Sequence, residues 1–446
     1  MNIVIAGAGD VGFHLAELLV NENQNITLID EDEEVLSYAA EHLDVRTVLG
    51  DSSSHEILKQ ANASNADLFI AVATAHATNI LACLIAKKLG AKKTLARTNS
   101  MEYLEEVPRA HFASLGVDEL FSPGKLAVEE IGRLIKRVST TDFIDFENGK
   151  VSVLGFTADD SSKLVGKQFK ELTDEATDYH IKIVCVLRDD ETILVKPDQT
   201  IRARDHIYMA TDNDGLSILN AHIGKSLRNI SRVMIIGSSK LALETACALE
   251  NTYDVKVIMK SEKECKHFVK HLNNALVIKG NPNNSELLKE EGLEFMDAFI
   301  ALTPNSETNI LASLNAEKAG VYKTIALVDN VAYTHISQSI GIDTIINKKL
   351  LAANEIFRHV RKGKVEAIAS FHGVDGKIIE YQISSESPLV NKSICDVDMH
   401  GQAVIAGVVR NDNGIIPKSD FNLEIGDHVI VFALPGELES LENIFK

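Results

Sequence analysis

The fold follows from one stretch of the chain, Ile3-Val4-Ile5-Ala6-Gly7-Ala8-Gly9-Asp10-Val11-Gly12. Its first four residues are apolar and favour a buried strand, and the residues after Gly9 begin a segment with helical spacing of apolar side chains. The Gly-x-Gly-x-x-Gly pattern between them is typical of a turn that holds a dinucleotide. Gly7 permits the tight turn, Gly9 lets the backbone approach a pyrophosphate, and Gly12 lets the helix pack closely on the strand. A packing turn without a ligand is the alternative.

The residue that specifies the nucleotide is Asp30, which ends the second expected strand, 21 residues after Gly9. A carboxylate at this distance binds the ribose hydroxyls and repels a 2′-phosphate, so the pattern favours NAD or NADH over NADP. The amide groups at the start of the helix would hold the phosphates.

Further candidates follow other strands, because ligands gather at the carboxyl ends of an open parallel sheet. Asp51 follows the third strand, and Ala73-Thr74 follow the fourth. Arg97 follows the fifth and could reach phosphate oxygens, with a surface salt bridge as the alternative. Asn79 either caps its own helix or contacts the ligand.

The chain is a tandem repeat at an offset of 230 residues, since Thr78-Asn79-Ile80-Leu81-Ala82 returns unchanged as Thr308-Asn309-Ile310-Leu311-Ala312. Near the ends the offset is 222, where Asp205-His206 faces Asp427-His428. Two copies of one unit of about 225 residues therefore make up the 446 residues.

Each copy has two parts. In the first part, strand-like runs such as Ile26–Ile29 alternate with helical segments, which predicts a Rossmann-like, doubly wound parallel sheet. The second part is short and rich in strands, which predicts a small α+β module. We expect an α/β protein with four domains, two Rossmann lobes at 1–140 and 230–365 and two α+β modules at 143–227 and 366–446.

The second copy has lost most of the nucleotide pattern. Gly237 is the only glycine kept, and Ser239 replaces Gly9. Lys260 stands in the place of Asp30, and Leu327 stands in the place of Arg97. We therefore expect a degenerate site in the second lobe.

Composition excludes several classes of partner. The net charge of −19 argues against nucleic acid and against an anionic lipid surface. No run of 18 apolar residues occurs, so neither a membrane span nor lipid insertion is expected. The five scattered cysteines favour a reducing cytosol, and neither they nor the histidines show metal-ligand spacing. We expect no metal, with His206 and His428 as turn residues before a strand.

A dehydrogenase would need a positioned acid or base in each copy, but the residues shared by the two copies are apolar or belong to turns. Binding without catalysis is therefore the favoured reading, with no catalytic residues. An NAD-dependent oxidoreductase and a regulatory subunit of a different ion transporter are the alternatives.

The tandem arrangement, the Gly7–Gly12 turn, Gly50-Asp51, Thr78-Asn79-Ile80, Ala96-Arg97 and the Gly-Asp-His run at 426–428 are similar to the TrkA family. This family comprises cytosolic regulatory subunits of bacterial Trk potassium uptake systems, built from two RCK (KTN) units. The resemblance covers essentially the whole chain. Asn99 stands where relatives often carry a second arginine.

The resemblance implies a regulatory subunit that binds NAD(H), and ATP or ADP as alternative ligands, in the first lobe. It also implies a homotetrameric ring on the cytoplasmic face of the inner membrane, docked on a TrkH-type potassium-translocating subunit. The nucleotide contacts it implies are Gly7, Ala8, Gly9, Asp10, Val11, Asp30, Asp51, Ala73, Thr74 and Arg97.

Overall fold

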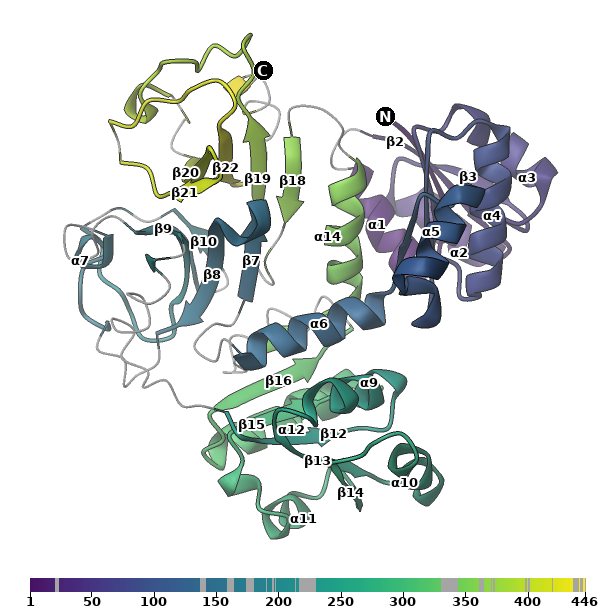
Figure 1. Cartoon of the computed structure of the whole chain (residues 1–446), viewed down its shortest axis with the longest axis vertical. Coiled ribbons are helices and arrows are strands. Elements are labelled where there is room, and N and C mark those ends of the chain that lie inside the picture. The colour runs from purple at the N-terminus through teal and green to yellow at the C-terminus, as the bar shows by residue number, and fades with distance from the viewer. Residues whose placement is uncertain are drawn as a thin grey trace. The chain divides into compact units, whose positions relative to one another are not determined.

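Figure 1 shows the computed structural model of the chain. It describes all residues except 21–23, 137–141, 159–163, 174–179, 190, 195, 197, 213, 216–229, 330–343, 361–364, 370, 372–373, 398, 400–401, 419, 436–440, 442–443 and 446. Two compact units form, residues 1–127 with 348–360 and residues 128–347 with 361–446. The first unit contains one parallel sheet, and the second contains another parallel sheet and two antiparallel ones.

The first lobe is a six-stranded parallel sheet with the strand order β3-β2-β1-β4-β5-β6. Its elements are β1 Asn2–Ala6, α1 Asp10–Val20, β2 Asn25–Asp30, α2 Glu33–His42, β3 Arg46–Leu49, α3 His55–Gln60, β4 Leu68–Ala71, α4 His76–Leu89, β5 Lys93–Arg97, α5 Glu106–Leu115, β6 Glu119–Phe121 and α6 Pro123–Lys136. The central strands β1 and β4 are almost completely buried, as expected for a parallel sheet covered on both faces. The strand order reverses between them, and such a switch point is where open sheets bind ligands.

The second lobe repeats this order as β14-β13-β12-β15-β16-β17. Its elements are β12 Arg232–Ile236, α9 Lys240–Leu249, β13 Asp254–Met259, α10 Glu262–Val269, β14 Leu276–Lys279, α11 Ser285–Glu290, β15 Ala298–Ala301, α12 Ser306–Lys318, β16 Lys323–Leu327, β17 Thr344–Ile346 and α14 Lys348–Val360. The predicted tandem Rossmann-like fold is confirmed.

One helix departs from the linear repeat. Although α14 follows the last strand of the second lobe, it belongs to the first unit, where it packs along α1 (Figure 1). Lys349 of α14 forms an ion pair with Asp10 at the start of α1, with 3.2 Å between Nζ and Oδ2. The boundary between the two units also passes within α6. The domain range 230–365 expected from the sequence therefore contains a helix whose packing partner is in the first lobe.

The two small modules are antiparallel sheets of five strands each, in the equivalent orders β7-β8-β11-β9-β10 and β18-β19-β22-β20-β21. The first has β7 Asp142–Phe146, β8 Val151–Thr157, α7 Lys170–Thr173, β9 Ile181–Arg188, β10 Glu191–Ile193 and β11 His206–Asp212. The second has β18 Val365–Ala369, β19 Lys377–Gln382, β20 Ala403–Arg410, β21 Asn413–Ile415 and β22 His428–Ala433.

The same buried ion pair recurs in both modules. Arg188 Nε lies 2.7 Å from an oxygen of Asp205, and Arg410 Nε lies 2.8 Å from an oxygen of Asp427. Each aspartate is almost fully buried and also accepts a hydrogen bond from a backbone amide three residues before it. This arrangement explains why the Asp-His pairs align in the repeat, because a buried carboxylate is tolerated only when it is paired.

The two modules share one hydrophobic core within the second unit. Val151 and Tyr208 of the first module belong to the same cluster as Phe371 and Phe432 of the second. The rings of Tyr208 and Phe371 lie 4.5 Å apart. The modules therefore form one packed pair.

The expectation that His206 and His428 precede a strand needs correction, because each is the first residue of one, β11 and β22. Backbone pairing opposite Thr157 and Gln382 places them in the sheet. Among the described residues, no helix has both the length and the apolar character needed to span a bilayer.

Candidate functional site

The glycine-rich turn has the close backbone contacts that its sequence predicts. Gly7 has a φ of +101°, a conformation that glycine adopts at little cost. A Cβ on Gly12 would lie 1.8 Å from the carbonyl oxygen of Gly7, and a Cβ on Gly7 would lie 2.7 Å from the backbone nitrogen of Ala73. Both positions therefore require glycine for packing alone, with or without a ligand.

Gly9 differs from its two neighbours in the motif. Its carbonyl accepts the first hydrogen bond of α1, from the amide of Phe13 at 2.8 Å, so it occupies the N-cap position. A Cβ on Gly9 would meet no atom of the described residues within 4 Å, and the φ of Gly9 is not positive. Neither packing nor backbone conformation requires a glycine here. The position therefore supports the second role predicted for it, which is to leave space for a ligand against the helix start.

Asp30 lies beside this turn, at the end of β2. Its Oδ2 accepts a hydrogen bond from the amide of Ala8 at 2.6 Å, and its Oδ1 accepts one from the amide of Asp32 at 3.1 Å. These bonds hold the carboxylate next to the glycine turn. A carboxylate has about four lone-pair sites, so it can still accept hydrogen bonds from a ribose.

The ends of β4 and β5 are joined by Asn79, which is 1% exposed. Its Nδ2 donates to the carbonyls of Ala73 and Arg97, at 2.9 Å each. The N-cap of α4 is Ala75, so Asn79 does not cap its helix. Its two hydrogen bonds instead link the carboxyl ends of β4 and β5. Its Oδ1 is buried and has no hydrogen-bond partner in the described part of the chain.

Arg97 places a guanidinium at the same edge of the sheet. Its Nε is buried without a hydrogen-bond partner among the described residues, and its Nη1 donates a long hydrogen bond to the carbonyl of Val72, at 3.5 Å. Burial lowers the pKa of this guanidinium below its usual value. A buried donor without an acceptor is costly, and a phosphate would satisfy it.

The remaining predicted residues are less closely associated with this edge. Asp51 turns its Oδ1 to the amide of Ser53 at 2.7 Å and so forms a local turn. Asp10 pairs with Lys349, and the side chain of Thr74 is exposed. Lys349 was not predicted, since it comes from the other copy of the repeat and no local spacing connects it with α1.

The second lobe closes the equivalent position with a side chain. Ser239 is the N-cap of α9, and its Oγ accepts from the amide of Ala242 at 3.2 Å and donates to the carbonyl of Leu302 at 3.0 Å. This side chain occupies the helix start that Gly9 leaves open in the first lobe. Lys260 is exposed and has no acceptor for ribose hydroxyls.

These observations fit an adenosine diphosphate moiety in the first lobe. The open N-cap at Gly9 and the Nε of Arg97 supply donors for phosphates, and Asp30 supplies an acceptor for ribose. Gly9 follows β1 and Asp30 ends the neighbouring strand β2, while Arg97 ends β5, on the other side of the switch point between β1 and β4.

Comparisons of sequence place the chain among known proteins. The family model of the TrkA-N domain matches residues 3–123 and 233–348, and that of the TrkA-C domain matches residues 378–446. The chain is 32% identical to a protein of Methanosarcina mazei named Trk system potassium uptake protein TrkA homolog 1, over the full length of both. It is 29% identical to the Trk system potassium uptake protein TrkA of Halomonas elongata, over 100% of this chain and 99% of that one.

Solved structures agree with the fold. The crystal structure of the GsuK RCK domain has a TM-score of 0.61 and 16% identity, covering 100% of this chain and 94% of that chain. The structure described as the GsuK channel bound to NAD also has a TM-score of 0.61, with 15% identity, covering 100% of this chain and 78% of that chain.

Proposed function

The chain belongs to the TrkA family, and on that premise we propose that it is the regulatory, nucleotide-sensing subunit of a potassium uptake system. It binds NAD(H), with ATP or ADP as alternative ligands, in the first Rossmann lobe. The observation that carries this proposal is the contrast between the two helix starts, open at Gly9 and closed by the side chain of Ser239. One nucleotide is bound per chain.

Binding without catalysis is the second part of the proposal. The groups at the switch point serve recognition, since Asp30 accepts hydrogen bonds, Asn79 ties two strand ends and Arg97 supplies a donor. A hydride-transfer enzyme would need an acid or base aimed at a substrate beside the nicotinamide. An NAD-dependent oxidoreductase is the alternative, and turnover of NADH with a small carbonyl compound by the pure protein would favour it.

The partner is a TrkH-type membrane subunit, with four copies of this chain forming a ring on its cytoplasmic side. Names of full-length relatives support potassium uptake. A nucleotide shifts such a ring between two arrangements only by its differential affinity for them. A shift from 1:99 to 99:1 needs about 5.5 kcal/mol, which four coupled sites supply if each prefers one arrangement about tenfold.

Co-purification from detergent-solubilised membranes tests the partner. We expect a membrane protein that carries potassium when it is reconstituted with this chain, and a response of the flux to NADH or ATP. A transporter for another ion would replace the potassium assignment with the alternative regulatory role. Absence of any membrane partner, together with NADH turnover, would contradict the proposal.

We expect Asp30→Asn to weaken NADH binding by about 10- to 100-fold, since hydrogen bonds to a charged group contribute about 1.5–3 kcal/mol. The asparagine keeps an oxygen for the amide of Ala8, so the local structure is retained. Isothermal titration calorimetry measures the change. The matched control is Asp67→Asn, because Asp67 accepts a hydrogen bond from the amide of Asn2 beside the start of β1, at the opposite edge of the sheet, and NADH affinity should not change. Equal affinity of Asp30→Asn and wild type would remove Asp30 from the site.

We expect Arg97→Met to weaken ADP binding by about 10- to 100-fold, through loss of a charge-assisted hydrogen bond to phosphate. The substitution also removes a buried donor that has no partner among the described residues, so the unliganded protein should be at least as stable as wild type. Calorimetry with ADP and thermal unfolding without nucleotide measure the two effects. Unchanged ADP affinity combined with lower stability would show that Arg97 has a structural role instead.

A further inference from the structure

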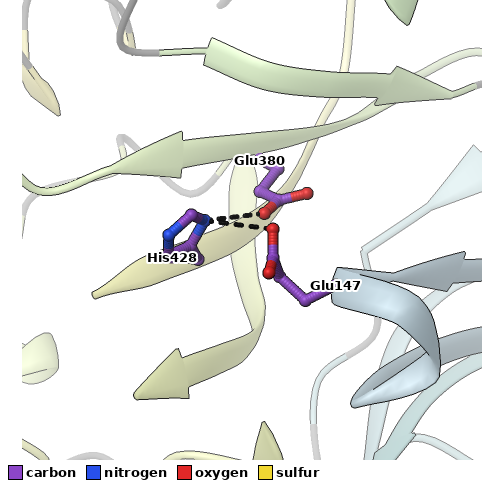
Figure 2. Close-up of side chains that lie close together, drawn as sticks. All are labelled: Glu147, Glu380 and His428. Carbon is purple, nitrogen blue, oxygen red and sulfur yellow. Dashed lines mark hydrogen bonds and ion pairs between the residues drawn. The ribbon is translucent and has the colours of Figure 1, made fainter. Parts of the chain in front are cut away.

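Three side chains from the two small modules converge at one point, Glu147, Glu380 and His428 (Figure 2). Glu147 follows β7 of the first module, and the other two lie on β19 and β22 of the second. The Nδ1 of His428 lies 2.9 Å from Oε1 of Glu380 and 3.3 Å from Oε1 of Glu147. One ligand atom from each residue lies within 4.8 Å of the others.

The sheet holds two of these groups in place. His428 pairs with Gln382 across β19 and β22, so Glu380, two residues earlier on β19, is its diagonal neighbour on the same face. The side chain of Glu380 is only 3% exposed, while that of His428 is 18% exposed and that of Glu147 is 32% exposed. The cluster is therefore anchored in the sheet and reachable from solvent at Glu147.

The ligand types in this arrangement suit a divalent cation. A carboxylate as buried as that of Glu380 is costly unless it is paired. The Nδ1 of His428 and one oxygen of each carboxylate face a common point, as the ligand atoms of one ion would. A metal ion between the three groups would satisfy both carboxylates and the imidazole nitrogen together.

We propose that Glu147, Glu380 and His428 bind one Zn²⁺-class divalent ion, which bridges the two small modules. In tetrahedral zinc sites the Zn–N and Zn–O distances are about 2.0–2.2 Å, so two ligand atoms of one site lie roughly 3.3 Å apart. The distances from Nδ1 of His428 to the oxygens of Glu380 and Glu147, 2.9 Å and 3.3 Å, are close to this value. Imidazole suits zinc and its neighbours, whereas Ca²⁺ takes six to eight oxygen ligands. A three-ligand site leaves a position for water.

The outer contacts of the histidine agree with this assignment. Nε2 of His428 lies 3.4 Å from the side-chain amide of Gln382. Metal-bound histidines usually donate their second N–H to an acceptor, and rotation of the amide would present its oxygen there. Among the described residues, the first module has no equivalent site, because Gly155 stands in the position of Glu380 and Thr157 in that of Gln382.

The site is independent of the proposed nucleotide function. All three ligands belong to the second unit, while Gly9, Asp30 and Arg97 belong to the first. Loss of metal binding should leave NADH affinity unchanged, so the two proposals fail separately. Because the ligands come from both modules, the ion would fasten the pair that already shares a hydrophobic core.

The test is titration of the chelator-treated full chain with Zn²⁺ by calorimetry, and with Co²⁺ by visible absorption. We expect one high-affinity Zn²⁺ per chain, an absorption band typical of tetrahedral Co²⁺, and a higher unfolding temperature with Zn²⁺. Ca²⁺ and Mg²⁺ should bind at least about 100-fold more weakly. Glu380→Gln and His428→Gln should each weaken Zn²⁺ binding at least about 30-fold, and Glu147→Gln about tenfold.

The control is His271→Gln, which removes half of an unrelated histidine pair on and after α10, where the rings of His267 and His271 lie 4.5 Å apart. Zn²⁺ binding should survive this change. If Glu380→Gln or His428→Gln fails to fold, Glu147→Gln decides, because its side chain is the most exposed of the three. Absence of Zn²⁺ binding below about 1 mM, or binding that Glu147→Gln leaves unchanged and His271→Gln abolishes, would overturn the proposal.

Discussion

We expect Gly12→Ala to destabilise the first unit by at least about 3 kcal/mol, the largest effect on stability that a single methyl group should have in this lobe. The added Cβ would lie 1.8 Å from the carbonyl oxygen of Gly7 and 3.3 Å from a methyl carbon of Val72. The first of these atoms belongs to the backbone of the glycine turn and cannot rotate away. The start of α1 would have to move off β1.

Thermal unfolding of the nucleotide-free chain measures this effect, with a lower midpoint for the transition of the first unit. The matched control is Gly9→Ala, because a Cβ at Gly9 meets no atom within 4 Å. Its stability should fall by no more than about 1 kcal/mol, since alanine is a poorer N-cap than glycine but lowers the entropy of the unfolded chain. Equal midpoints for Gly12→Ala and Gly9→Ala would show that α1 does not need its close approach to β1.

We expect Gly9→Val to abolish nucleotide binding, with NADH and ADP affinity lowered at least about 100-fold, while the protein remains folded. The valine side chain would occupy the space at the helix start in which the pyrophosphate is proposed to lie. Because the position has no positive φ and no close neighbour, the fold can accept the side chain. Calorimetry gives the affinity, and circular dichroism with thermal unfolding reports the folded state.

The matched control for this prediction is Ser239→Val, the same helix position in the second lobe. It removes a helix cap, which costs about 1 kcal/mol, and should leave NADH affinity unchanged. Normal nucleotide binding by Gly9→Val would place the pocket elsewhere in the chain. Loss of binding by Ser239→Val alone would assign the nucleotide to the second lobe.

The contrast between the two lobes has a consequence for how the chain works. Both copies keep the sheet and the asparagine that ties two strand ends, since Asn309 donates to the carbonyls of Thr303 and Leu327 as Asn79 does to Ala73 and Arg97. In the second lobe, however, Oδ1 of Asn309 accepts from Thr303. The oxygen that has no partner on Asn79 among the described residues is thus satisfied on Asn309, and we infer that the second lobe is mainly structural.

The sequence predicted what depends on neighbours along the chain. The glycine turn, the strand before it and the helix after it lie within a short segment, and Asp30 is fixed relative to Gly7 by the spacing of two adjacent strands. Gly90, with a φ of +127°, ends α4, and a glycine directly after an apolar helix is a common local stop signal. The repeat itself required only a comparison of the chain with itself.

Other features arise only from packing between distant segments. Helix α14 follows the last strand of the second lobe but packs on α1 of the first. Its Lys349 therefore pairs with Asp10, a residue from the other copy of the repeat. The sequence treated His428 as a turn residue, whereas strand pairing places it beside Glu380 and module packing adds Glu147.

By itself, therefore, the sequence determined the tandem Rossmann-like architecture and the identity of the lobe with the nucleotide pattern, because hydrophobic periodicity and turn chemistry act over a few residues. Only the tertiary structure decided which polar groups have no partner within the described part of the chain, as at Nε of Arg97, and which charged groups from different modules meet. The physical reason is that burial and the pairing of charges depend on contacts between segments far apart in the chain, for which the local pattern of residues carries no signal.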